Sequence, residues 1–175
     1  MTSARYGMIH GRFQPFHNGH LEYLKLALER CDTLIVGITN PDPMQTREDS
    51  ASEHRHLAES NPFTFFERLL MVRDTLVEER IALDRVVVTP FPVNLPDRWR
   101  YYLPPGVTCY LRVFSAWEQS KAGRLADHGY AVEILQPGAI KEVEATEVRR
   151  RLREGENWRE LVPPAVARVV AARPG

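Results

Sequence analysis

The residues best suited to chemistry lie in one short stretch, Gly11-Arg-Phe-Gln-Pro-Phe-His-Asn-Gly-His20. His17 and His20 are three positions apart, so on the first turn of a helix their imidazoles share one face. The free N–H groups and the positive dipole end of such a helix favour an anion. Two imidazoles beside them can hold the bridging oxygens of a triphosphate and stabilise charge on a departing pyrophosphate. Gly11 and Gly19 let a bound group approach the backbone closely. The stretch therefore predicts a phosphate-binding loop.

A histidine pair near a helix start also suits a metal site, or an ordinary surface or core position. No third His, Cys or carboxylate is spaced to complete zinc coordination, so we expect no metal site built from protein ligands. The full string, placed between a strand and a helix, favours the phosphate-binding interpretation over packing alone.

Apolar runs and amphipathic stretches alternate along the chain and must position this loop. The expected strands are 6–10, 34–39, 85–89, 108–114 and 130–135, and the expected helices are 21–28, 65–77, 116–128, 146–154 and 164–172. Strands separated by helices of this length predict an α/β fold, a parallel sheet with helices on both faces. In such sheets a ligand binds at the carboxyl ends of the strands, where the strand order switches direction.

One segment, 40–62, breaks this alternation. It holds three prolines and many polar residues and shows no periodicity. A loop of that length in a compact domain is usually functional or disordered. Because it follows a strand's carboxyl end and carries Arg47, His54 and Arg55, we interpret it as a lid over the site. A solvated insertion is the alternative.

Length and composition limit the domain organisation and the classes of partner. The 175 residues suit one domain, 1–175, with its own hydrophobic core and C-terminal helices over 146–175. Lys+Arg and Asp+Glu are equal at 23 each, so no overall field draws the protein to nucleic acid or to a membrane. The short polar start and the absence of a long apolar run predict a cytoplasmic protein. Cys31 and Cys109 stand outside any CxxC spacing, and we expect buried thiols.

The string from Gly11 to His20 resembles the signature of the HxGH nucleotidyltransferase superfamily, in the subgroup of archaeal-type nicotinamide mononucleotide (NMN) adenylyltransferases. Three further segments are similar to that subgroup: 61–68 (NPFTFFER), 146–151 (TEVRRR) and 155–163 (GENWRELVP). The resemblance implies a Rossmann-like fold, Mg²⁺ as cofactor, direct transfer without a covalent intermediate, and a homo-oligomer.

The resemblance also implies roles for individual residues. His17, His20 and Arg149 would be catalytic, with the two histidines on the triphosphate and Arg149 on its β- and γ-phosphates. The nucleotide and its phosphates would further contact Gly11, Arg12, Phe13, Gln14, Gly19, Thr146, Glu147 and Val148. These residues suit nucleotidyl transfer, because the reaction needs mainly the positioning of its substrates and the stabilisation of charge.

The chain departs from the subgroup in two places. Where the subgroup has a Ser-Gly-Asn motif that helps bind NMN, this chain has Phe114-Ser-Ala-Trp117, and Glu144 replaces the expected Ser of the second phosphate motif. The segment 117–121 (WEQSK) resembles instead the W-E-x-K region of cytidylyltransferases in the same superfamily. The candidate acceptor-binding residues are Arg47, His54, Arg55, Trp99, Trp117 and Lys121, although a packing role is open for both tryptophans.

Three functions remain open on these observations. The favoured one is transfer of a nucleoside monophosphate from an NTP, with CTP preferred, to a small phosphate or phosphonate acid such as phosphonoformate, with release of pyrophosphate. The first alternative is NMN adenylyltransferase, which makes NAD from ATP and NMN. The second is a non-catalytic nucleotide sensor, which would not need the whole set His17, His20, Thr146 and Arg149.

Overall fold

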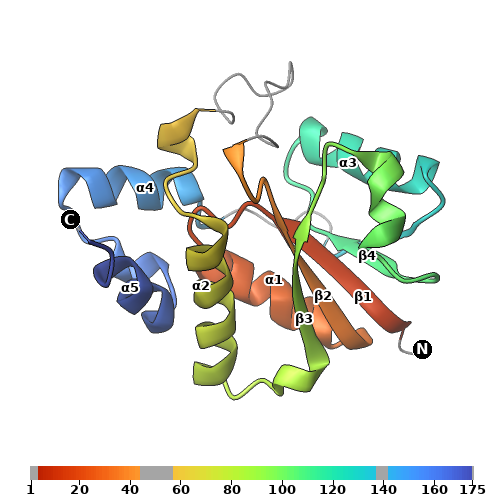
Figure 1. Cartoon of the computed structure of the whole chain (residues 1–175), viewed down its shortest axis with the longest axis horizontal. Helices are drawn as coiled ribbons and strands as arrows, with labels where there is room; N and C mark the ends of the chain where they lie inside the picture. The colour runs from red at the N-terminus through yellow and green to blue at the C-terminus, as the bar shows by residue number, and fades with distance from the viewer. Residues whose placement is uncertain (1–3, 44–56, 137–141, 175) are drawn as a thin grey trace.

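A parallel β-sheet forms the centre of the computed structural model, which describes residues 4–43, 57–136 and 142–174 (Figure 1). Its five strands are β1 (Ala4–Gly11), β2 (Cys31–Thr39), β3 (Val86–Phe91), β4 (Thr108–Leu111) and β5 (Ala131–Ile134). They lie in the order β3-β2-β1-β4-β5, and every neighbouring pair is parallel. The predicted parallel α/β sheet is confirmed.

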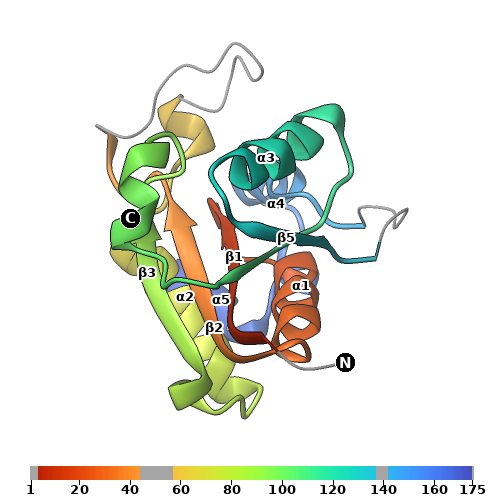
Figure 2. The same ribbon diagram turned by 90° about the vertical axis from the view of Figure 1, so that its right-hand side faces the viewer.

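Helices cover both faces of this sheet, as expected. The α-helices are α1 (Asn18–Leu28), α2 (Phe65–Glu78), α3 (Ala116–Asp127), α4 (Ala145–Glu154) and α5 (Pro164–Ala171), and the short 3-10 helices are η2 (Ala58–Ser60), η3 (Leu83–Arg85), η4 (Pro96–Tyr101) and η5 (Arg159–Leu161). α1, α2 and α5 pack Leu24, Met71 and Val166 into the core on one face. On the other face, α3 and η4 pack Leu125 and Trp99 (Figure 2).

The two cores follow from the alternation of side chains along each strand. In β1, Met8 belongs to the core under α3, whereas Ile9 belongs to the core under α1 and α2. Successive strand residues point to opposite faces, so the next residue, His10, shares the face of Met8. This places a histidine at the carboxyl end of a central strand, on the α3 side.

Strand β4 is shorter than predicted. We expected 108–114, but the strand ends at Leu111. The backbone N–H of Phe114 donates to the Glu118 carboxylate at 2.8 Å, and Ser115 then caps α3. Phe114 and Ser115 are therefore part of the start of α3, and the chain leaves the sheet earlier than predicted.

Helix α2 begins with a capping box. Thr64 N–H donates to the Glu67 carboxylate at 2.7 Å, and Glu67 N–H donates to the Thr64 hydroxyl at 3.2 Å. Cys31 and Cys109 are buried free thiols, and burial raises the pKa of Cys109 to about 12. Among the described residues, no helix is both long and apolar enough to cross a membrane.

The strand order places a topological switch point beside β1. Its two neighbours are β2, which follows it in the chain, and β4, which comes much later. The chain therefore leaves β1 and β4 toward different sides, and a crevice opens at their carboxyl ends. The loop from β1 to α1, which carries the phosphate-binding string, lies at this crevice.

Candidate active site

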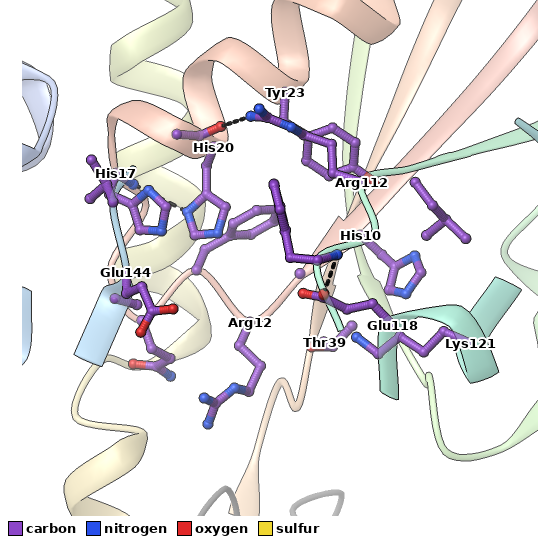
Figure 3. A pocket seen from close by; sticks show the side chains of 18 of the residues that line it. His10, Arg12, His17, His20, Tyr23, Thr39, Arg112, Glu118, Lys121 and Glu144 are labelled. Carbon is purple, nitrogen blue, oxygen red and sulfur yellow. Dashed lines mark hydrogen bonds between the residues drawn. The ribbon is translucent and has the colours of Figure 1, made fainter. Parts of the chain in front are cut away.

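A cavity of about 720 Å³ occupies the crevice, a size that accommodates a small ligand. Figure 3 shows side chains from several elements around it. The predicted site residues that line it are Gly11, Arg12, Phe13, Gln14, His17, Gly19, His20, Thr146, Trp117 and Lys121. Two sides of this cavity differ, and we call them the α1–α4 wall, around His17, His20 and Thr146, and the α3 wall, around His10, Trp117 and Lys121.

The histidine pair stands at the start of α1. His17 is the N-cap residue, and its backbone N–H donates to Nδ1 of His20 at 3.2 Å. With Nδ1 accepting, the neutral ring of His20 carries its proton on Nε2 and becomes a donor. The two rings stack with centroids 3.6 Å apart. The pair therefore offers hydrogen-bond donors on one surface, beside the free N–H groups of the helix N-terminus.

The ring of Phe13 packs against this histidine pair. Its ring meets His20 edge-on, with centroids 4.9 Å apart, and it is 1% exposed. A Cβ on Gly11 would come within 2.8 Å of the Phe13 ring, and a Cβ on Gly19 within 3.1 Å of the His17 ring. The glycines therefore make room for aromatic side chains of the protein, an addition to the ligand approach that the sequence suggested.

A buried arginine, Arg68, fixes the loop behind the histidines. Its guanidinium donates to the backbone carbonyls of Arg12, Thr39 and Asn40 at 2.8, 2.7 and 2.8 Å, and its Nε donates to the Thr64 carbonyl at 3.1 Å. Burial lowers its pKa to about 10, so it stays charged at neutral pH. These bonds hold together the ends of β1 and β2 and the start of α2.

Gln14 is also part of this framework. Its side-chain amide exchanges two hydrogen bonds with the backbone of Phe63, both at 2.9 Å, and it is 2% exposed. We expected Gln14 to bind the nucleotide, but its polar atoms are engaged within the protein. Arg12 reaches toward the same segment, with its guanidinium 3.4 Å from the Ser60 carbonyl and 3.3 Å from Asn61 Oδ1.

A second helix N-terminus faces the cavity from α4. Its N-cap residue is Glu144, and Thr146 in its first turn is exposed to the cavity. Arg149, one turn further, donates to the Gln14 carbonyl at 2.7 Å and to the Thr146 hydroxyl at 3.2 Å. Arg149 thus connects the start of α4 to the β1–α1 loop, which is a positioning role. Its direct contact with phosphates stays a prediction.

Two predicted phosphate-binding residues of α4 point elsewhere. Val148 is fully buried in the core, and the carboxylate of Glu147 bonds Arg150 and Arg151 at 2.8–2.9 Å. Those arginines hold the pKa of Glu147 at about 2. The backbone N–H groups of both residues donate to the Glu144 carbonyl. Glu147 and Val148 therefore do not line the cavity, and their contact with the nucleotide's phosphates stays a prediction.

The α3 wall is built from side chains. The Lys121 ammonium lies 3.7 Å from the centroid of the Trp117 ring, a close cation–π contact. Glu118, between them in the sequence, uses its carboxylate on Phe114 N–H and on the Ser115 hydroxyl at 3.1 Å. Trp117 and Lys121 therefore face the cavity, while Glu118 mainly holds the start of the helix.

Trp99 has a packing role, which is one of the two alternatives that the sequence left open. It is 1% exposed, stacks on Phe91 with centroids 5.8 Å apart, and donates its indole N–H to the Pro92 carbonyl at 2.9 Å. It is the buried residue of η4 and belongs to the core under α3. Arg47, His54 and Arg55, together with most of the expected lid, lie outside the described residues.

Sequence reasoning missed several cavity residues, among them His10 and Arg112. Both come at the carboxyl end of a strand, which is the signal that could have identified them. Arg112 donates to Glu22 at 3.0 Å and to Gln136 at 3.2 Å. It closes the cavity between α1 and β5.

Comparison with known proteins shows which family this chain belongs to. Residues 8–95 match the family model described as cytidylyltransferase-like. A phosphonoformate cytidylyltransferase from Streptomyces viridochromogenes is 47% identical over 164 residues, which cover 94% of this chain and 89% of that protein. The chain belongs to the cytidylyltransferase-like family.

Other relatives of this cytidylyltransferase-like chain carry a second activity. A nicotinamide-nucleotide adenylyltransferase from Thermococcus kodakarensis is 35% identical over 166 residues, covering 94% of this chain and 81% of that protein. The crystal structure of a bifunctional NMN adenylyltransferase/ADP ribose pyrophosphatase from Francisella tularensis matches with a TM-score of 0.72 at 19% identity. The match covers 96% of this chain but only 49% of the Francisella tularensis chain. At this low identity the likeness shows the Rossmann-like fold alone. The relatives are nucleotidyltransferases, and so is this enzyme.

The cavity of this cytidylyltransferase-like enzyme suits a divalent ion that arrives with the nucleotide. Among the residues that the structure describes, no three His, Cys, Asp or Glu side chains gather as a metal site. Mg²⁺ usually keeps several waters and binds through substrate phosphates and one or two carboxylates. The carboxylate of Glu144 lies on the same side of the cavity as His17 and His20 (Figure 3). A related structure from Francisella tularensis is a complex with AMP and a manganese ion.

Proposed function

We propose that this enzyme transfers a cytidylyl group from CTP to a small phosphonate acid, with phosphonoformate as the leading acceptor, and releases pyrophosphate. The observation that carries the proposal is the 47% identity to a phosphonoformate cytidylyltransferase across 94% of the chain. The identity to an NMN adenylyltransferase over the same length is 35%. The composition of the α3 wall supports the same choice.

The transfer requires positioning and stabilisation of charge. An oxygen of the acceptor's phosphonate, already ionised at neutral pH, attacks the α-phosphorus of CTP. A bond forms between that oxygen and phosphorus, and the bond from phosphorus to the α–β bridging oxygen breaks. The electron pair leaves with pyrophosphate, and no proton has to be removed from the nucleophile. The protein contributes an environment for the charge that moves onto the leaving group.

The α1–α4 wall supplies this environment. His17 and His20 present their stacked rings to the cavity, and the N-terminal turns of α1 and α4 face the same space. Two helix N-termini with their free N–H groups favour the negative charge of a triphosphate. Arg149 keeps the two turns together through Gln14 and Thr146. We assign the triphosphate to this wall.

Mg²⁺ fits as the cofactor of this reaction. When bound, it would neutralise charge on the phosphates and on the departing pyrophosphate. Glu144, at the start of α4, is placed to hold the ion or a water of its shell. The protein's own contribution is then to fix the triphosphate relative to the acceptor. We further propose a homo-oligomeric, cytoplasmic enzyme, as the family resemblance and the composition predict.

The α3 wall favours a compact acceptor. The subgroup of NMN adenylyltransferases has Ser-Gly-Asn where this chain has Phe114-Ser-Ala-Trp117. Trp117 carries one N–H donor and cannot replace the paired donor and acceptor of an Asn amide. Its ring also fills space and holds the Lys121 ammonium at 3.7 Å, which favours an anionic group. NMN adenylyltransferase activity is the alternative function, supported by the relatives of that name.

A substrate screen tests the proposal directly. Pyrophosphate release would be measured for CTP, ATP, GTP and UTP, each with phosphonoformate, glycerol 3-phosphate and NMN. We expect the highest kcat/KM with CTP and phosphonoformate, and little NAD from ATP and NMN. Efficient NAD synthesis without turnover of CTP and any small acid would establish the alternative instead. Turnover with no pair would support a non-catalytic sensor.

A further inference from the structure

His10 is a buried polar side chain that the transfer chemistry does not use. It lies at the carboxyl end of β1, is 7% exposed, and lines the cavity. Its Nδ1 is buried and has no hydrogen-bond partner among the described residues. The ring contacts Phe91 at a centroid distance of 5.6 Å. A buried imidazole nitrogen without a partner is unfavourable unless a ligand completes its hydrogen bonding.

The charge state of His10 follows from its surroundings. Burial, and to a smaller extent the nearby ammonium of Lys121, lower its pKa to about 3. The ring is therefore neutral at physiological pH, with one N–H donor and one nitrogen acceptor. A neutral donor can bind an anionic oxygen without adding a third positive charge beside the lysine.

Two cations from α3 face the same space. Lys121 and Arg124 line the main cavity and also a second, small cavity, and His10 lines both as well. Figure 3 shows His10 and Lys121 together on the side of the cavity away from His17 and His20. Glu118, which lies near them, has its carboxylate engaged by Phe114 N–H and the Ser115 hydroxyl. The combination favours an anion with hydrogen-bond acceptors.

We propose that His10, Lys121 and Arg124 form a subsite for a second anionic group of the acceptor, a carboxylate at the end away from the reacting phosphonate. This inference rests on the proposed function, because it specifies which acceptors that site takes. The reacting end must reach the triphosphate at the α1–α4 wall, and the other end then meets the α3 wall. A nucleoside acceptor would instead place neutral groups against two cations. The subsite thus selects compact acids that carry two anionic groups.

A kinetic comparison of two acceptors tests the subsite. Phosphonoformate has the carboxylate and methylphosphonate lacks it, so only the first can use the subsite. In Lys121→Met and His10→Val we expect the KM of phosphonoformate to rise about 10-fold or more, since hydrogen bonds to charged groups are worth that much. The KM of CTP and the kinetics with methylphosphonate should stay within about twofold. Lys25→Met is the matched control, because Lys25 pairs with Glu79 on the outer surface.

A binding measurement separates this inference from the proposed function. Calorimetric titration of phosphonoformate into the enzyme with a non-hydrolysable CTP analogue requires no turnover. Weaker binding to Lys121→Met than to Lys25→Met, with His10→Asn binding more tightly than His10→Val, supports the subsite. Equal binding to all these variants, or none to the wild type, overturns it. If the wild type binds phosphonoformate but does not turn it over with CTP, the proposed function fails and the subsite stands.

Discussion

The α1–α4 wall is held mainly by hydrogen bonds to backbone atoms, whereas side-chain contacts shape the α3 wall. Arg68, Gln14 and Arg149 all donate to main-chain carbonyls around the phosphate-binding loop. On the other side, Lys121 is positioned by the ring of Trp117. Substitution of one residue in the first wall would disturb several segments at once, whereas substitution in the second changes local chemistry.

This difference explains how one family can serve different acceptors. In the proposed reaction the triphosphate is bound at elements that are held through the backbone. The proposed acceptor subsite lies at a strand end and on one helix face, which can change without moving the loop. Under this proposal, specificity depends on a few side chains, here His10, Trp117 and Lys121.

The largest effect is expected at the α1–α4 wall. His20→Ala should lower kcat by about 100-fold or more, because one preorganised donor at a developing charge is typically worth that much. The measurement is pyrophosphate release with saturating CTP and acceptor, with circular dichroism to verify folding. His128→Ala is the control, since His128 is exposed and lies outside the cavity. Wild-type turnover by a folded His20→Ala enzyme would remove this wall from the mechanism.

A smaller loss is expected when the framework behind that wall is broken. Arg68→Met should lower the free energy of unfolding by about 2 kcal/mol or more, because it leaves several carbonyls without a donor. Activity should fall as well, since the ends of β1 and β2 lose their common partner. Chemical denaturation would measure this, with Arg73→Met as control because Arg73 is exposed on the same helix. An unchanged midpoint would contradict the framework role.

Much of the α1–α4 wall could be predicted from the sequence, but less of the α3 wall. The helix limits, the parallel sheet and the position of His17 and His20 depend on local patterns and could be predicted. The exchange between Gln14 and Phe63 joins segments 49 positions apart, and no local pattern reveals it. Glu147 and Val148 were assigned from a motif, but the helix turns them away from the cavity.

Residues of the α3 wall were missed for the same reason: their proximity arises between distant parts of the sequence. His10 lies at the end of an apolar strand and carries no recognisable motif. Its proximity to Lys121 depends on the packing of α3 against the sheet, which brings together residues more than a hundred positions apart. For Trp99 the sequence left two roles open, because an aromatic residue in a polar segment can bind a ligand or fill the core. The fold shows that Trp99 is buried in the core.

On the α3 wall, Trp117→Leu should raise the KM of the acceptor by about two- to fivefold, since a cation–π contact contributes about 0.5–1 kcal/mol at such a site. The change removes the ring that holds Lys121 but keeps apolar volume. Trp117→Phe retains a ring and should recover most of the affinity. Initial rates at saturating CTP measure both variants. Equal effects of Leu and Phe would show that the ring's charge distribution is not used.

The smallest effect concerns the protonation of His10 in the α3 wall. His10 has a pKa of about 3 in the folded protein and an ordinary value of 6.5 when unfolded, owing first to burial and then to Lys121. Between these two values the unfolded chain binds the extra proton, so stability is complete above pH 6.5 and falls as the pH drops. From pH 7 to pH 6 this histidine should remove roughly 0.7 kcal/mol of unfolding free energy.

His10→Gln lacks the titrating group, and its loss of unfolding free energy over the same interval should be smaller by that amount. Denaturant titrations of both proteins at the two pH values give the comparison. Parallel pH profiles would mean that His10 already accepts a proton in the folded state, and the α3 wall would then carry a third positive charge instead of a neutral donor.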